Sequence, residues 1–270
     1  MQEMLANPAV QGVLAPFIAA LVVAALLAPL RLGGLAVVAA FATAVYFIAG
    51  FTFAPLTATR KIVLLGLAAP LAGIVIDFAF RPTRLEAWVL ALGGAAAAAW
   101  IFWPVLAQKD PERALLLGGT AVLAAAWTVG FSHSRLAEDG VRAGAAGLAL
   151  GIGAGGAAIL GASLTYGLYG GAVAAGSGAF LLVQMIIGKK THAGATFMLA
   201  AALVTMLLAA AAKILAQAPW CAVAVLTLVP LAASLPVSAG APVWLQALLL
   251  SFFGLFVSGI ACALAWHAGG

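Results

Sequence analysis

Asp77 is the side chain of this sequence with the clearest capacity for chemistry within an apolar segment. It is the only acid in the apolar run 62–80, and an ionisable residue at membrane depth is by default a candidate functional site. Its carboxylate would bind a proton or a cationic solute. Arg81 follows at the i, i+4 spacing of a helical ion pair. The structural alternative is therefore an Asp77–Arg81 pair near the membrane interface.

Uncharged polar residues are expected at membrane depth in the second half of the chain. Together with Asp77 they form a candidate solute path: Gln184, Thr205, Thr227, Gln246 and Ser251. These side chains would line a polar route if they faced one cavity. Two structural alternatives stay open, because each hydroxyl can bond to the carbonyl four residues back in its own helix and Gln184 can join two helices.

Small residues recur at intervals of three or four along the uncharged run 143–188. The predicted helix-packing positions are Gly144, Gly147, Gly151, Gly155, Gly171 and Gly178. Small residues at such intervals let helix backbones approach closely. The pattern therefore predicts tight packing within the bundle, with a subunit interface as the alternative.

Enzymatic chemistry finds little support in the residue types and their spacing. The polar segment 132–142, which contains His133, is expected to be a solvated loop, so no helix presents the paired axial histidines of a membrane haem. The carboxylates are far apart in the sequence, and catalysis by a carboxylate pair needs two that converge. Cys221 and Cys262 form no CxxC motif. We therefore expect no catalytic residue, no cofactor and no metal site, and a protein that is not an enzyme.

The composition places the chain in a bilayer. Of its 270 residues, 66% are hydrophobic and 7% are charged, whereas soluble domains have about 25% charged residues. The net charge of +5 is dispersed between apolar runs, which is typical of membrane-flanking charge and gives no basic patch for nucleic acid. The expected fold class is an all-α polytopic membrane bundle with the lipid bilayer as its first partner.

About ten apolar runs are long enough to be transmembrane helices, since a span needs about 20 residues. They cover residues 10–30, 35–53, 62–80, 86–106, 114–131, two runs within 143–188, and then 196–215, 220–235 and 242–266. Within 143–188 a turn is expected near 163–171, with Tyr166 and Tyr169 at the membrane–water boundary. Asp110 and Pro111 predict the start of the fifth helix, with the Asp110 carboxylate as its cap.

The ten expected spans form a single transmembrane domain, 1–270, with two nearly equal halves, 10–131 and 143–266. Five helices per half would invert the second half relative to the first, as in many secondary transporters. We therefore expect a permease-like protein that moves a small neutral or lipophilic solute, in a bacterial-type inner membrane. The alternative is a non-catalytic subunit or scaffold of a membrane complex, and a homodimer or a foreign partner is open in either case.

Overall fold

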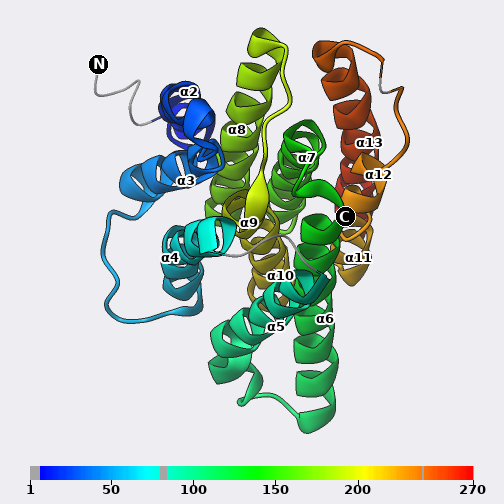
Figure 1. The fold of residues 1–270 in the computed structure, drawn as a ribbon. Helices are drawn as coiled ribbons and strands as arrows, with labels where there is room; N and C mark the ends of the chain where they lie inside the picture. The colour runs from blue at the N-terminus through cyan, green and yellow to red at the C-terminus, as the bar shows by residue number, and fades with distance from the viewer. Residues whose placement is uncertain (1–6, 80–83, 239, 270) are drawn as a thin grey trace.

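The computed structural model describes residues 7–79, 84–238 and 240–269, and within these ranges all regular structure is helical. The helices pack as one bundle (Figure 1). In chain order they are η1 (Val10–Leu14), α2 (Ala15–Leu27), η2 (Ala28–Leu30), α3 (Leu35–Ile48), α4 (Ala58–Ala79), α5 (Arg84–Leu106), α6 (Pro111–Leu136), α7 (Gly140–Leu160), α8 (Leu164–Ile187), α9 (Gly194–Met198), η3 (Leu199–Leu203), α10 (Val204–Ala216), α11 (Trp220–Leu226), α12 (Val229–Ala233) and α13 (Val243–Gly269).

Eight helical segments are long and apolar enough to cross a membrane, and two shorter apolar segments, Leu35–Ile48 and Trp220–Ala233, accompany them in the described part of the chain. Some segments combine several elements, because η1, α2 and η2 are continuous, as are α9, η3 and α10. The expected fold class is thus confirmed. The chain is a multi-pass, all-α integral membrane protein.

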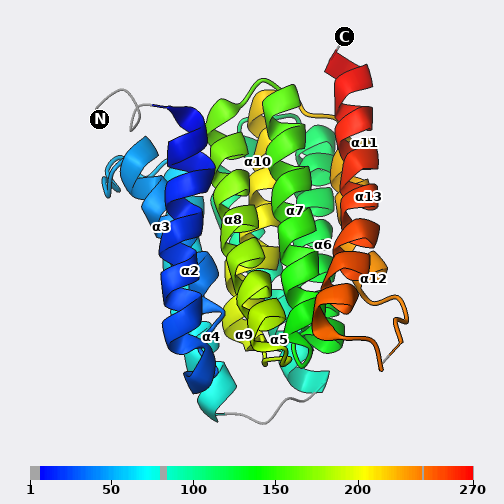
Figure 2. The ribbon, with the colours of Figure 1, turned by 90° about the horizontal axis from the view of Figure 1, so that it is seen from above.

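The segments form a buried centre and a lipid-facing periphery. In the span Gly194–Ala216, 83% of the apolar window is buried, against 17% in Val10–Leu30. The helices α7 and α8 pack against each other in the centre, where α13 flanks α7, and α2 and α3 flank α8. Figure 2 shows this order, with α7, α8 and α10 between α2–α4 and α13. A helix that is apolar on all sides is stable at such a central position.

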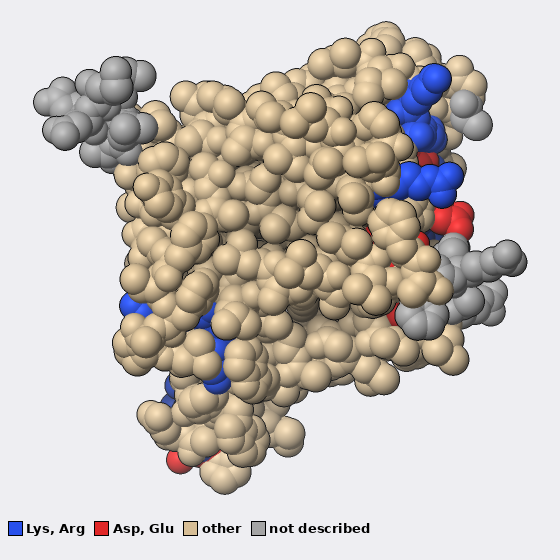
Figure 3. All heavy atoms as spheres, turned by 60° about the vertical axis from the view of Figure 1, so that its left-hand side comes forward, with Lys and Arg blue, Asp and Glu red and all other residues tan. Residues whose placement is uncertain are grey.

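Charged side chains lie at two opposite edges of the face shown in Figure 3, with a broad band of uncharged residues between them. Such a band matches the hydrocarbon core, and the charged edges match the two membrane surfaces.

We call one end of the bundle the Asp77 end. There the connections 137–139 and 188–193 meet through the main-chain hydrogen bonds of Gly140 and Ala193. The opposite end, which carries the connections 49–57, 107–110 and 217–219, is called the Lys61 end.

Close contact between α7 and α8 occurs where neither helix has room for a side chain. A Cβ added to Gly151 would lie 2.5 Å from the Ala174 nitrogen, and one added to Gly170 would lie 2.6 Å from the Gly155 Cα. The remaining predicted packing glycines lie against side chains or backbone of the same chain: Gly144 against Leu181, Gly147 against Ser177, Gly171 against Gly12 and Gly178 against Leu148.

The turn between α7 and α8 lies at 161–163, before the predicted 163–171. Gly167 and Gly170 are inside α8, where they serve the close approach to α7 rather than a turn. Tyr166 and Tyr169 are buried between helices in the first turns of α8, and the Tyr166 hydroxyl is 2.8 Å from Thr59 Oγ1 in the first turn of α4. The prediction of a turn at Gly167 and Gly170 was therefore wrong, because these glycines belong to a helix that packs closely against α7.

Five of the described spans contain a π-turn, a break or an internal proline, and the first of them is the span 10–30, which begins with the π-helical turn η1. Pro70 lies inside α4 and Pro104 inside α5, and proline leaves the carbonyl four residues earlier without its helical donor. The π-helical turn η3 interrupts the buried span 194–216, and a break between α11 and α12 precedes Pro230. At that break the Trp127 indole N–H donates to the Thr227 carbonyl over 3.3 Å, which satisfies a backbone group at the interruption.

Gly151→Ala tests the close packing of the central helices. The added methyl would meet backbone rather than a movable side chain, so we expect a loss of about 1–3 kcal/mol of stability, measured as a lower thermal unfolding midpoint in detergent micelles. Gly259→Ala in α13 is the matched control, because nothing lies within 4 Å of its added Cβ. Equal midpoints for both variants would contradict the packing described.

Candidate functional site at the Asp77 end

Asp77, in the last turn of α4, binds the N-terminus of α9. Its carboxylate accepts hydrogen bonds from the Ala195 N–H at 2.6 Å, the Thr196 N–H at 3.0 Å and the Thr196 hydroxyl at 2.7 Å. The residue before α9 is Ala193, which gives no side-chain cap, so the acceptor comes from another helix. A carboxylate at this position satisfies free N–H groups and is stabilised by the helix dipole. The alternative pairing with Arg81 lies outside the described residues.

Gly194, the first residue of α9, makes this contact sterically possible. Its φ of +68° is in the left-handed region, and an added Cβ would collide with the Asp77 carboxylate. Glycine adopts such a φ without the penalty that side chains impose. Backbone conformation and lack of a side chain therefore both fit this residue to the position.

His133 and Glu86 form a second buried polar pair beside Asp77. His133 Nε2 lies 2.9 Å from Glu86 Oε1, and the two side chains are only 5% and 10% exposed. Asp77 is close enough to act electrostatically on the imidazole. We call Asp77, Glu86, His133 and Thr196 the Asp77 cluster, which joins α4, α5, α6 and α9.

The prediction that His133 lies in a solvated loop was wrong. Helix α6 continues to Leu136, which is fully buried, and only 137–139 connect it to α7. The polar composition of 132–142 hid this helix end. The available signal was the four-residue spacing of Thr128, Ser132 and Leu136, which continues a helical face without an intervening proline.

Several buried polar atoms of α6 have no hydrogen-bond partner within the described residues. They include the hydroxyls of Thr128 and Ser132 and the Nδ1 atom of His133. Thr128 and Ser132 are four residues apart, so they lie on one face of α6. Buried polar atoms are nearly always hydrogen-bonded, to water where protein groups do not serve. This face of α6 thus carries hydroxyl groups whose hydrogen-bonding capacity is not used within the described residues.

Charged and amide groups tie together the connections at the Asp77 end. The Asp139 carboxylate accepts N–H groups of Val141 and Arg142 at the start of α7 and lies 2.7 Å from Lys190 Nζ. Gln184 Oε1 accepts the Thr191 N–H at 3.0 Å. At the start of α6, in contrast, Asp110 precedes Pro111 as predicted but its side chain makes no capping hydrogen bond.

The predicted solute path is only partly assembled. Asp77 and Gln184 contact the same connecting segment, 191–196. The other predicted residues are satisfied or placed elsewhere: Thr205 donates to Ala201 and Ala202 carbonyls, Thr227 to that of Ala224 and Gln246 to that of Ala241, while Ser251 is buried with no partner among the described residues. The structure does not join these four to the Asp77 cluster through hydrogen bonds.

Neither the grouping of possible metal ligands nor similarity to known proteins assigns a chemistry to the Asp77 cluster. In the described ranges, no three His, Cys, Asp or Glu side chains are grouped to hold a metal ion. Comparison of the chain with protein-family models, curated proteins and solved structures finds no match. The interpretation of the site therefore depends on its own geometry.

Asp77→Asn tests the cross-helix cap. The amide places an N–H₂ group near backbone donors and removes the charge, so we expect a loss of about 1–3 kcal/mol of stability, measured as the thermal unfolding midpoint in detergent. Asp110→Asn is the matched control, since it removes a carboxylate that makes no capping bond, and it should change the midpoint little. Similar losses in both variants would exclude a specific role of the Asp77 contact.

Proposed function

We propose that this integral membrane protein is a permease-like carrier of a small neutral or lipophilic solute. The observation that carries the proposal is the position of the helix interruptions. In two halves of five spans, the third and eighth spans correspond, and they contain Pro70 and η3. The fourth and ninth spans also contain prolines, but Pro104 lies in the last turn of the continuous helix α5 whereas the break before Pro230 lies in the middle of its span, so this pair does not match in position. Interrupted helices at corresponding positions of two halves are typical of carrier substrate sites.

The Asp77–α9 contact supports the same proposal. It links the third span to the eighth and is one of the polar contacts between the two halves, beside Thr59–Tyr166 and Trp127–Thr227. A carrier that alternates its access needs contacts at each surface that can form and break. In this proposal the three hydrogen bonds to Asp77 are one such contact, and they lie beside the close packing of Gly73 on the Thr196 backbone.

The solute class follows from the polar groups that remain. The carboxylates of Asp77 and Glu86 are already engaged, by the α9 N-terminus and by His133. The hydroxyls of Thr128 and Ser132 are buried and without a partner among the described residues. Such groups suit an uncharged molecule with few hydrogen-bonding atoms, and they argue against a strongly charged one.

Transport of this kind needs no catalytic residue, so we propose that the protein is not an enzyme. We also propose a bacterial-type inner membrane as its location, because its spans are helical.

A second candidate function is that of a non-catalytic subunit or scaffold. The observation that favours it is that Gln184, Thr205, Thr227 and Gln246 make hydrogen bonds to main-chain groups. A scaffold would hold its polar residues in this way and use a lipid-facing surface for a partner chain. The two functions therefore differ in what copurifies with the protein and in what crosses the membrane.

Native mass spectrometry and a flux measurement separate these functions. We expect the tagged full-length chain, extracted from its own membrane in mild detergent, to be a monomer or homodimer without a stoichiometric foreign chain. In proteoliposomes we expect glycerol or urea to equilibrate faster than in protein-free vesicles, measured by stopped-flow light scattering.

The same flux measurement is made on Asp77→Asn protein inserted at equal density. We expect the rate of solute equilibration in these vesicles to differ from that of the wild type. A stoichiometric foreign chain combined with flux equal to that of empty vesicles would overturn the carrier proposal in favour of the subunit.

A further inference from the structure

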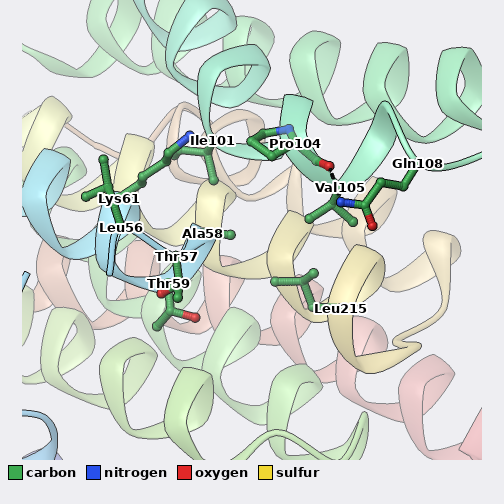
Figure 4. Close-up of a pocket in the computed structure, with 10 residues that line it drawn as sticks. All are labelled: Leu56, Thr57, Ala58, Thr59, Lys61, Ile101, Pro104, Val105, Gln108 and Leu215. Atoms are coloured by element: carbon green, nitrogen blue, oxygen red, sulfur yellow. Dashed lines mark hydrogen bonds between the residues drawn. The ribbon is translucent and has the colours of Figure 1, made fainter. Parts of the chain in front are cut away.

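A cavity of about 350 Å³ lies at the Lys61 end, opposite the Asp77 cluster. It lies between the N-terminal turn of α4, the last turns of α5 and the end of α10, and its lining combines Lys61, Thr57 and Gln108 with apolar residues such as Ile101 and Leu215 (Figure 4). A second, more open cavity at the surface, of about 460 Å³, also includes Lys61, together with Ala99, Trp100, Trp103 and Pro104. The Lys61 side chain therefore borders a partly polar space and an apolar one.

Lys61 is buried to an unusual degree for a lysine, with 8% of its surface exposed. Its Nζ donates to the Trp100 carbonyl over 2.9 Å and lies 4.6 Å from the centroid of the Trp100 ring. That carbonyl lacks its helical donor because Pro104 follows four residues later. Within the described residues no carboxylate lies within ion-pair distance of Lys61. A buried ammonium group without an anion is costly, so an anionic partner would stabilise it.

The N-terminus of α4 adds positive potential at the same place. Its first turn contains no acid but includes Arg60 beside Lys61, although cations are unfavourable at the positive end of a helix dipole. The Arg60 guanidinium donates to the Pro55 carbonyl at 2.9 Å, which holds it beside the turn. Arg60 lines neither cavity, and the N–H groups of Arg60 and Lys61 are bound by Thr57, so the cation that a phosphate would meet in the cavities is Lys61, with the positive potential of the helix end beside it.

The apolar part of the site faces outward from the bundle. Trp103 is 70% exposed and Trp100 is 43% exposed, and in a membrane protein such surfaces contact lipid at the interface. A free anion would use only the polar part of the site, whereas an amphiphile would use both cavities that share Lys61. We propose that this site binds an anionic phospholipid, with the headgroup phosphate at Lys61 and an acyl chain along Trp100, Trp103 and Pro104. This proposal is independent of the proposed transport.

Lipid titration with native mass spectrometry tests the site on the delipidated full-length chain. We expect phosphatidylglycerol to bind more tightly than phosphatidylcholine with the same acyl chains, and inorganic phosphate alone not to compete. Lys61→Gln keeps a donor for the Trp100 carbonyl but removes the charge, and it should weaken phosphatidylglycerol binding about five- to ten-fold. Lys61→Arg should retain most of the affinity.

Lys109→Gln is the matched control, because it removes a cation from the connection 107–110 of the same end and Lys109 itself lines neither cavity, and it should bind phosphatidylglycerol as the wild type does. If Lys61→Gln does not fold, Leu215→Trp replaces it, since the larger ring fills the cavity from α10 and leaves Lys61 intact. Equal affinity for the two lipids, equal affinity of the wild type and the cavity variant, or displacement by inorganic phosphate would each overturn the proposal.

Discussion

The bilayer forces every main-chain polar group at membrane depth to find a partner inside the protein, and the few ionisable side chains of this chain meet that demand. Asp77 and Asp139 bind the N-termini of α9 and α7. Arg142 donates to the carbonyls at 233 and 235, where α12 ends, and Lys61 donates to the carbonyl that Pro104 leaves free. The signs follow the helix dipole at the first three positions, with acids at N-termini and a cation at a C-terminus. Charge is thus placed where helices begin, end or break.

The second organising feature is the lack of side chains between α7 and α8. Gly151 and Gly155 allow the two backbones to touch, and close backbone contact replaces the hydrophobic driving force that is missing between helices in lipid. The pair forms a rigid centre, on which α13 packs from one side and α2 and α3 from the other. The interruptions Pro70, Pro104 and η3 lie outside this pair. The irregular turn η3 nevertheless belongs to the span 194–216, which is itself buried in the centre beside this pair.

The two polar regions at opposite ends of the bundle differ in chemistry. The Asp77 cluster is buried between four helices, and its acids are matched by donors on other helices. The Lys61 site has a buried cation, no carboxylate at ion-pair distance in the described part, and an apolar border that faces lipid. The first region is suited to hold the halves of the protein together, and the second is suited to bind an amphiphile from the membrane.

The sequence by itself determined that the chain is an all-α membrane bundle, and it located ten apolar segments, because hydropathy over about 20 residues is a local property. It also indicated the start of α6 at Pro111 and singled out Asp77.

The tertiary structure decided what Asp77 contacts, because α9 lies more than a hundred residues away in the chain. It also moved His133 from an expected loop into a buried pair with Glu86, and it placed the buried Lys61 at the border of two cavities. Hydropathy registers the polarity of a residue but not the neighbour that satisfies it, and only packing between distant segments supplies that neighbour.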